Sequence, residues 1–296
     1  MRTQMIAGLL AAVLLPAIAS AQGGDAWRER SFTPTPAGEW TGARLPDGQP
    51  DVQGHWSNTI GNHNNITNPA GGGRGGGERA PSRVSDPPDG QIPYQPWARA
   101  RQQEFAAHLD NPIKPEYVEP LARCAPGGPT KSFMWHGYEI RQYAGYVVFF
   151  FDSGTRIIHL REQTHLPATI KLWNGDSRGR WDGNTLVVDV ANNNSKSRFG
   201  RTGEFVSENA AIQERYVFDP KGERFTYHAT YTDPTVLTRP FTITIPNKRV
   251  TETTPQDGWN NITFRAKHAG ADPIIEAYER TCVENNGNHG EVALDK

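Results

Sequence analysis

The fold is decided by residues 173–190, which read WNGDSRGRWDGNTLVVDV. Within them, Asp182, Gly183 and Asn184 are residue types that adopt the positive backbone angles of a tight hairpin turn. A β-branched, apolar run begins directly after the turn, at Thr185, and such a run is typical of a strand. Similar strand–turn–strand sequence continues to about residue 246. We therefore predict an antiparallel sheet.

Further strand-like segments surround this hairpin and alternate between apolar and polar side chains, as half-buried strands do. Residues 146–151 are apolar on both faces and should be central. Because an open sheet of this size leaves exposed edges, the strands are predicted to close into a barrel, and a two-sheet sandwich is the alternative. The predicted strands are residues 138–142, 146–151, 155–160, 185–190, 211–218, 224–232 and 241–245, with a further strand at 262–266 and a last strand or short helix at 274–281.

The N-terminus has the pattern of a secretory signal peptide. Arg2 precedes an apolar run, residues 6–18, and the small residues Ala19, Ser20 and Ala21 follow it. The run is shorter than the ~20 apolar residues that span a bilayer, so we predict cleavage of residues 1–21 rather than a membrane anchor. The mature protein is expected to be periplasmic or secreted, with no integral membrane span.

The mature chain would carry nearly balanced charge. Removing residues 1–21 takes away one of the 31 basic residues and none of the 32 acidic ones. Such balance gives no electrostatic footprint for nucleic acid or for an anionic membrane. The expected partner is therefore a small-molecule ligand or substrate, and the sequence leaves the oligomeric state open.

Two parts follow the signal peptide. Residues 22–91 are rich in Gly, Pro, Asn and charged residues, which bury little apolar surface, so we predict an irregular and partly disordered arm. Residues 39–40 and 52–56 are the segments of this arm expected to dock. Residues 92–296 are predicted to be a single β-barrel domain with an N-terminal helix.

That helix is predicted at residues 96–109, where Pro96 is tolerated in the first turn. Trp97, Phe105 and Leu109 recur at helical spacing and are expected to share a buried face. The helix should pack on the outside of the sheet or across one of its ends.

Two cysteines, Cys124 and Cys282, flank the strand-rich region. An oxidising compartment permits them to pair, and a disulfide would then join the start of the domain to its end. The alternative is two separate free thiols.

Residues 173–189 resemble a segment shared by a group of uncharacterised exported bacterial proteins, W-x-G-D-S-x-G-x-W-x-G-x-T-L-V-V-D. The likeness extends to His165 and to residues 214–216 and 231–234, with weaker similarity at 45–52 and around Cys124. The resemblance implies a lipocalin-like or calycin-like barrel and assigns no activity. Where such proteins often have His-Pro, this chain has a leucine between His165 and the proline and so departs from the pattern.

Glu214 is the main candidate for acid–base chemistry, because it shares a predicted strand face with Ile212, Tyr216 and Phe218. An unpaired buried carboxyl group keeps its proton to higher pH, which suits a general acid or base. The alternatives are a structural pairing with an arginine such as Arg215, or a one-residue shift that places Glu214 in water.

His159 and His165 are the other candidate catalytic residues, since histidine exchanges protons near neutral pH. A hydrogen-bonded histidine of the core or rim is the alternative for His159. Together with a carboxylate such as Asp176, the two could form a metal site. No established metal-ligand spacing supports this, so we predict neither a metal nor an organic cofactor.

The ligand-binding candidates lie on the hairpin and on one strand. Trp173 and Asp176 come from the loop before the hairpin, and Tyr227 and Tyr231 from the apolar face of residues 224–232. Asp176 and Ser177 are expected to close that loop by hydrogen bonds from side chain to backbone. The spacing around Ser177 matches a nucleophile elbow, but no helix follows, so a catalytic serine is not predicted.

Two functions remain open. In the first, an exported enzyme uses Glu214 and His159 to exchange protons with a small, partly apolar or aromatic molecule in the barrel, as a cofactor-independent lyase, isomerase or hydrolase. In the second, the same barrel is a non-catalytic binding or carrier protein for a small hydrophobic ligand. The two differ in whether Glu214 and His159 face each other.

Overall fold

The computed structural model describes residues 32–59, 66–67, 82–108, 111–134, 137–151, 154–200 and 202–250. These residues are mainly β-structure, with helices α1 (Pro96–Ala107) and α2 (Pro129–Phe133) and two short 3-10 helices, η2 (Pro115–Tyr117) and η3 (Pro120–Arg123). The strands are β1 (Gly54–Asn58), β2 (Val84–Asp86), β3 (Tyr138–Tyr143), β4 (Tyr146–Phe151), β5 (Gly154–His159), β6 (Asp176–Asp182), β7 (Thr185–Ala191), β8 (Ala211–Phe218), β9 (Arg224–Thr232) and β10 (Phe241–Arg249).

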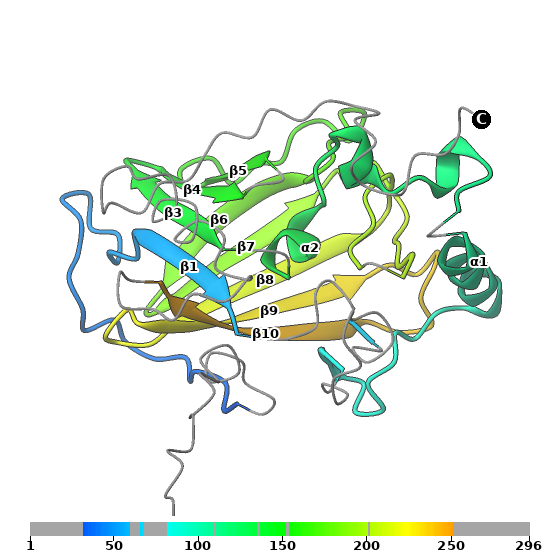
Figure 1. Ribbon diagram of the computed structural model, residues 1–296. Coiled ribbons are helices and arrows are strands. Elements are labelled where there is room, and N and C mark those ends of the chain that lie inside the picture. Colours follow the sequence, from blue (N-terminus) through cyan, green and yellow to red (C-terminus); the bar gives the residue numbers. More distant parts are fainter. Residues whose placement is uncertain are drawn as a thin grey trace, which may run out of the picture.

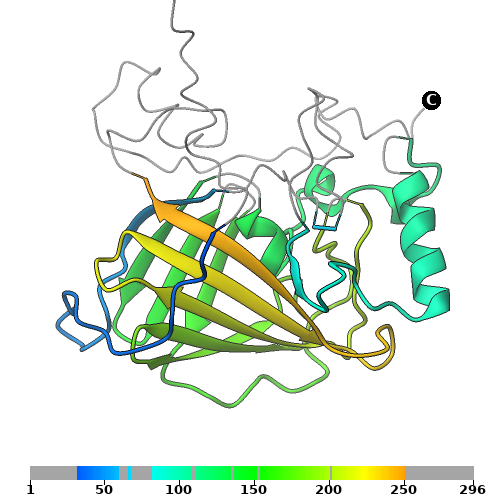
Figure 2. The ribbon, with the colours of Figure 1, turned by 90° about the horizontal axis from the view of Figure 1, so that it is seen from below.

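Nine of these strands form a closed, lipocalin-like barrel (Figures 1 and 2). The order is β1-β3-β4-β5-β6-β7-β8-β9-β10, and β1 closes the circle by pairing with β10. Strand β2 also pairs with β10, farther along the same strand. The predicted barrel is therefore confirmed, and closure leaves no long open edge in the wall.

The sheet is mixed rather than wholly antiparallel. Strands β5 and β6 run parallel and meet at His159 and Arg178. A parallel pair cannot be joined by a tight hairpin, and residues 160–175 make the longer connection. We call residues 160–175 the crossover segment.

Most predicted strands are present with nearly the predicted bounds, including β8 and β9, whose predicted bounds are the observed ones. Two barrel strands were not predicted. Strand β1 lies in the arm that we expected to be irregular, and β6 begins at Asp176, where we expected a loop. Both Asp176 and Ser177 are wall residues paired with β7. The expected hydrogen bond from side chain to backbone is present for Asp176, which accepts from the Leu166 N–H at 2.9 Å, whereas Ser177 Oγ accepts from Arg156 instead.

Aromatic rings fill the interior of the barrel. The ring of Trp56 packs edge-to-face on Phe218 and Phe225, with centroids 5.7 and 5.1 Å apart, an arrangement that the ring quadrupoles favour. The rings of Tyr231 and Phe241 stack with centroids 5.1 Å apart. The largest buried aromatic side chains are Trp56, Phe133, Tyr138, Phe149, Tyr216, Phe218, Phe225, Tyr227, Tyr231 and Phe241.

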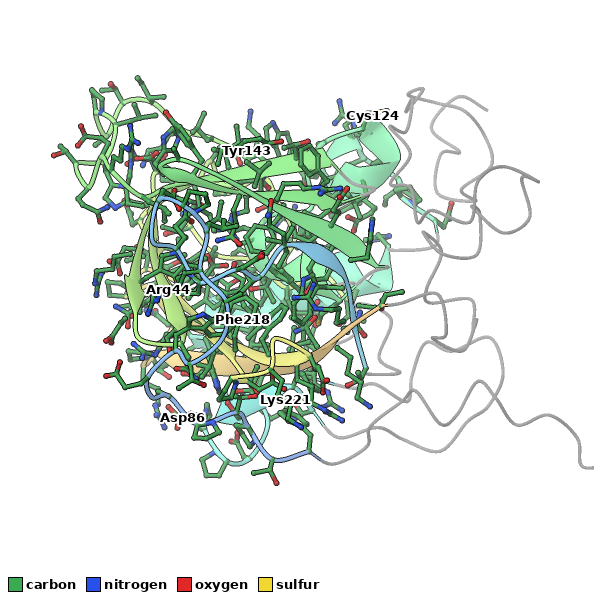
Figure 3. All side chains as sticks on the ribbon, turned by 90° about the vertical axis from the view of Figure 1, so that its left-hand side faces the viewer. Arg44, Asp86, Cys124, Tyr143, Phe218 and Lys221 are labelled. Atoms are coloured by element: carbon green, nitrogen blue, oxygen red, sulfur yellow. The ribbon has the colours of Figure 1, made fainter. Side chains whose placement is uncertain are left out.

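One end of the barrel is covered by residues 38–53. Trp40 is buried there, and the β6–β7 turn is held by two hydrogen bonds, from Gly38 N–H to Asn184 Oδ1 and from Asn184 N–H to the Gly38 carbonyl, both 2.8 Å. Figure 3 views this end, where the covering segment with the labelled Arg44 passes in front of the barrel. Trp40, Val52 and Trp56, which lie in the segments 39–40 and 52–56 that we predicted to dock, are all buried.

The interior is also filled by α2, all five residues of which are buried. In Figure 1 this helix lies between β1 and the wall of β7, β8 and β9. It carries Thr130 and Phe133 to the rings of the wall. A short helix from outside the sheet therefore occupies the interior of the barrel.

The predicted helix at 96–109 is present as α1. Phe105 is buried, but Trp97 is 51% exposed and meets the ring of Phe205 at 6.3 Å. The expected shared buried face is therefore wrong for Trp97, which lies in the first turn of the helix. Leu109 lies outside the described residues.

Several predictions fall on residues outside the described ranges. These are the signal peptide at 1–21, the strand at 262–266, the strand or helix at 274–281, and Cys282. Cys124 ends η3 with a left-handed backbone (φ 57°). Its disulfide with Cys282 stays a prediction.

Candidate functional site

The barrel wall carries a buried ion pair in its aromatic interior. Arg156 on β5 and Glu214 on β8 meet in a bidentate contact, Nη1 to Oε1 at 2.9 Å and Nη2 to Oε2 at 2.5 Å. The side chains are 2% and 0% exposed. Side chains alternate between the two faces of a strand. Arg156 therefore shares the inner face of β5 with Ile158, and Glu214 shares the inner face of β8 with Tyr216.

Three hydroxyl groups form the remaining hydrogen bonds of this ion pair. Arg156 Nε and Nη2 donate to Ser177 Oγ at 3.3 and 2.9 Å, and Nη1 donates to the Tyr216 hydroxyl at 3.1 Å. The Tyr227 hydroxyl donates to Glu214 Oε1 at 2.6 Å. All five N–H donors of the guanidinium group therefore have acceptors.

A chain of hydroxyl groups leads from Glu214 to α2. Thr130 Oγ1 lies 3.1 Å from the Tyr227 hydroxyl and 2.5 Å from the Tyr231 hydroxyl. Because the proton of Tyr227 is given to the carboxylate, Thr130 must donate to Tyr227, and Tyr231 must donate to Thr130. The hydrogen bonds thus run in one direction, Tyr231 to Thr130 to Tyr227 to Glu214.

Burial keeps the groups of this network in fixed protonation states. Burial raises the pKa of the Tyr216 and Tyr227 hydroxyls, and the charge of Glu214 adds to the rise at Tyr227. Burial also raises the pKa of Tyr231. Burial alone would lower the pKa of Arg156, but the charge of Glu214 outweighs it and the pKa is raised. The tyrosines therefore stay neutral, and the arginine is a permanent cation.

The ring of Phe133 occupies the space beside this network. Its centroid lies 4.5 Å from that of Tyr227 and 5.5 Å from that of Tyr216. It also meets the rings of Phe149 and Phe151 edge-to-face, at 5.4 and 5.0 Å. Phe133 and Thr130 together give the barrel one aromatic ring and one hydroxyl group from α2.

A second polar cluster lies where the crossover segment meets β6. His165 Nδ1 lies 2.9 Å from Asp176 Oδ2, which also accepts from the Leu166 N–H at 2.9 Å. Arg178 holds both carboxylate oxygens, Nε to Oδ2 at 3.1 Å and Nη2 to Oδ1 at 3.0 Å. Since Ser177 faces inward, Asp176 and Arg178 lie on the outer face of the wall.

This arrangement fixes the charges and the orientation of the cluster. Burial raises the pKa of Asp176, but the hydrogen bonds from the Leu166 N–H, Arg178 and His165 outweigh it, and the pKa falls below its ordinary value. The carboxylate accepts a hydrogen bond from Nδ1–H, so in the neutral imidazole Nε2 of His165 carries the free lone pair. The His165 side chain is 30% exposed.

The predicted site residues divide among three places. Glu214, Tyr227 and Tyr231 belong to the interior network, while His165 and Asp176 form the outer cluster near Trp173, which is half-buried on the crossover segment. His159 lies on the outer face of β5, where it meets Tyr146 with ring centroids 5.2 Å apart. Glu214 and His159 therefore do not face each other, because Arg156 and Ile158 take the inner positions of β5 and His159 lies on the opposite face.

Arg156, Thr130 and Ser177 were missed as members of the interior network. Arg156 is two residues before Ile158 and so lies on the same strand face. This spacing could have identified Arg156 as a residue of the inner face of β5. Thr130 lies on a helix too short to show periodicity. Among the described residues no cluster of three His, Cys, Asp or Glu side chains is placed to hold a metal ion.

Within the described ranges, no helix is long and apolar enough to cross a bilayer. Comparisons with models of protein families, with curated proteins and with solved structures found no match for this chain.

Proposed function

We propose that the protein is an exported, non-catalytic binding protein for a small hydroxylated aromatic molecule, and that the barrel interior is its binding site. The observation that carries this proposal is the content of the interior. An ion pair and three tyrosine hydroxyls lie among aromatic rings, beside a ring and a hydroxyl that α2 supplies.

The buried ion pair supports a role beyond stability. Well-packed apolar residues in place of such a pair often leave a protein equally stable or more stable. Departures from an apolar core tend to occur at functional sites. A ligand hydroxyl in the place of Thr130 Oγ1 would donate to Tyr227 and accept from Tyr231, and it would inherit the polarisation that Glu214 imposes on Tyr227.

The geometry favours binding over proton transfer at Glu214. Both carboxylate oxygens face the guanidinium group of Arg156, and Oε1 also accepts from Tyr227. No histidine of the described residues is among its partners, and His159 is on the other side of the wall. A ligand would therefore meet fixed donors and acceptors rather than an acid–base pair.

The ligand and α2 compete for one place in this proposal. The ring of Phe133 and the hydroxyl of Thr130 fill the positions that the ring and hydroxyl of the ligand would take. Ligand entry then requires α2 to leave the interior. Only molecules in which α2 has left can bind, so the apparent affinity is the intrinsic affinity multiplied by the fraction of such molecules.

The test is a calorimetric titration of the mature protein with p-cresol. The wild type should bind with saturation. T130V, which removes the hydroxyl that holds α2, should bind about 2–10-fold more tightly, since one net hydrogen bond is worth ~0.5–1.5 kcal/mol. Y227F, which removes the hydroxyl that the ligand would meet, should bind more weakly by a similar factor.

Y138F is the matched control for Y227F, because the Tyr138 hydroxyl donates to Asn247 Oδ1 at 2.7 Å and not to the network. It should bind p-cresol as the wild type does. Equal losses in Y138F and Y227F would place the ligand elsewhere. No binding by either the wild type or T130V would reject the proposal.

A second candidate function rests on the outer cluster. His165 has Nδ1 oriented by a buried carboxylate and Nε2 free to take a proton, which is the arrangement of a general base. Three exposed apolar side chains lie on the same segment, Leu166, Ile170 and Leu172. H165Q should abolish any hydrolysis of p-nitrophenyl acetate above background, whereas H159Q should not. Equal rates in both variants would exclude this function.

A further inference from the structure

Arg83 lies buried just before β2, and two of its guanidinium nitrogens have no partner among the described residues. It is 3% exposed. Its backbone is held on both sides, because its N–H donates to the Ile66 carbonyl and its carbonyl accepts from the Thr244 N–H, both at 2.8 Å. The flanking side chains of Ile66 and Val84 are buried and apolar. In the part of the chain that the structure describes, neither Nε nor Nη2 of Arg83 meets an acceptor.

These two nitrogens form one edge of the planar guanidinium group, the fork that matches the two oxygens of a carboxylate or phosphate. The chain uses the same edge elsewhere. Nε and Nη2 of Arg178 hold the two carboxylate oxygens of Asp176 at 3.1 and 3.0 Å. The same edge of Arg83 is buried and, among the residues that the structure describes, lacks an acid such as the one that Arg178 has.

The charge of Arg83 calls for a counter-charge. Burial lowers the pKa of Arg83 to about 10, so the group is still a cation at neutral pH. A buried charge without a partner is strongly unfavourable. The same low-dielectric surroundings strengthen its attraction to an anion that reaches it.

We propose that Arg83 is the recognition group of a second binding site, which takes a small oxyanion, a carboxylate or a phosphate, through Nε and Nη2. The site is made where β2 meets β10 and shares no residue with the Arg156–Glu214 network. It is therefore independent of the binding function proposed above.

The test is thermal unfolding of the mature protein in sodium acetate, sodium phosphate or sodium chloride at equal ionic strength. At about a hundredfold excess over its Kd, the bound oxyanion should raise the wild-type midpoint by roughly 5–10 °C over chloride. The oxyanion that saturates at the lower concentration identifies the ligand class. An equal midpoint in all three salts would overturn the proposal.

Two variants locate the effect. R83M removes a buried unpaired charge, so it should unfold at a higher temperature than the wild type in chloride and show no further rise with either oxyanion. R83K keeps a charge but lacks the fork, and its affinity for the oxyanion should fall about tenfold or more. If R83M does not fold, equal oxyanion affinities of R83K and the wild type would still overturn the proposal.

R239M is the matched control. Arg239 lies close to the same strand and pairs with Asp86 of β2 at 2.7 Å, but its side chain is 49% exposed. It should respond to acetate and phosphate as the wild type does. The same loss of response in R239M and R83M would show a general effect of net charge and would contradict a site at Arg83.

Discussion

Arg156 and Glu214 face each other across the barrel interior, with two hydrogen bonds of 2.9 and 2.5 Å between the guanidinium and the carboxylate. Their strands are not neighbours in the wall, since β6 and β7 lie between β5 and β8. The contact therefore bridges the inner face of β6 and β7 and depends on the curvature of the wall from β5 to β8.

The first prediction concerns this pair. E214Q leaves the charge of Arg156 buried without a counter-charge, so the free energy of unfolding should fall by about 3–5 kcal/mol. The double variant R156M/E214M replaces both charges by apolar side chains and should recover most of that loss. Urea unfolding of the three proteins measures this, and a double variant no more stable than E214Q would contradict it.

The second prediction concerns pH and Glu204, which is 1% exposed. Burial raises the pKa of Glu204 above 4.5 in the folded protein, so the folded state binds this proton more tightly than the unfolded state does. The resulting stability is complete below pH 4.5 and is lost as the pH rises through the folded pKa. E204Q cannot titrate, so its stability should exceed that of the wild type by an increasing margin as the pH rises in this window.

Urea unfolding at intervals between about pH 4 and pH 8 measures this difference, whose slope cannot exceed about 1.4 kcal/mol per pH unit for one group. E208Q is the control, because Glu208 is exposed in the same segment. Parallel stability curves for the wild type and E204Q would contradict the prediction.

The third prediction concerns Asp176, whose pKa is lowered below 3.8 in the folded protein. Its contribution to stability is present above pH 3.8 and is lost as the pH falls through the lowered folded pKa. D176N should therefore be less stable than the wild type at neutral pH, by about 1–3 kcal/mol, and the two should converge in acid. D189N, which alters an exposed pair with Arg180, should show little difference at any pH.

The fourth prediction concerns the β6–β7 turn. Gly183 has φ +58°, and a Cβ there would lie 2.1 Å from the Gly38 carbonyl oxygen. G222A carries the same backbone strain at φ +65°, but its Cβ would be 3.4 Å from the nearest atom. Left-handed backbone costs an alanine about 1–2 kcal/mol, so G222A should lose roughly that, and G183A should lose more because residues 38–53 must shift. Equal losses in the two variants, measured by thermal unfolding, would contradict this close contact.

The strands that could be predicted are those whose own side chains show the alternation. In β9, Phe225, Tyr227, Ala229 and Tyr231 are buried along one face, and both bounds followed from that pattern. Strand β6 shows no such pattern, because its inner positions include Ser177 and Gly179. A Cβ on Gly179 would lie 2.6 Å from Ile158 Cγ2, so the small residue is required by packing that no local pattern displays.

The candidate site was predictable only on the strand that carries Glu214. Its burial followed from alternation along β8, but its partner lies 58 residues away in sequence and depends on how the barrel closes. The position of α2 inside the barrel was not predictable, because a helix of five residues shows no helical periodicity in its sequence. Strand β1 was missed because only Trp56 marks it as apolar within a polar, glycine-rich segment.

In the proposed function, the barrel interior exchanges its own α2 for an aromatic ligand. Nuclear Overhauser effects measure this directly in protein with labelled Phe and Tyr rings, since Phe133 and Tyr227 have ring centroids 4.5 Å apart. On saturation with p-cresol, the effects between Phe133 and Tyr227 should disappear, and effects from p-cresol to Tyr227 and Tyr231 should replace them. Unchanged effects between Phe133 and Tyr227 at saturating p-cresol would contradict the claim.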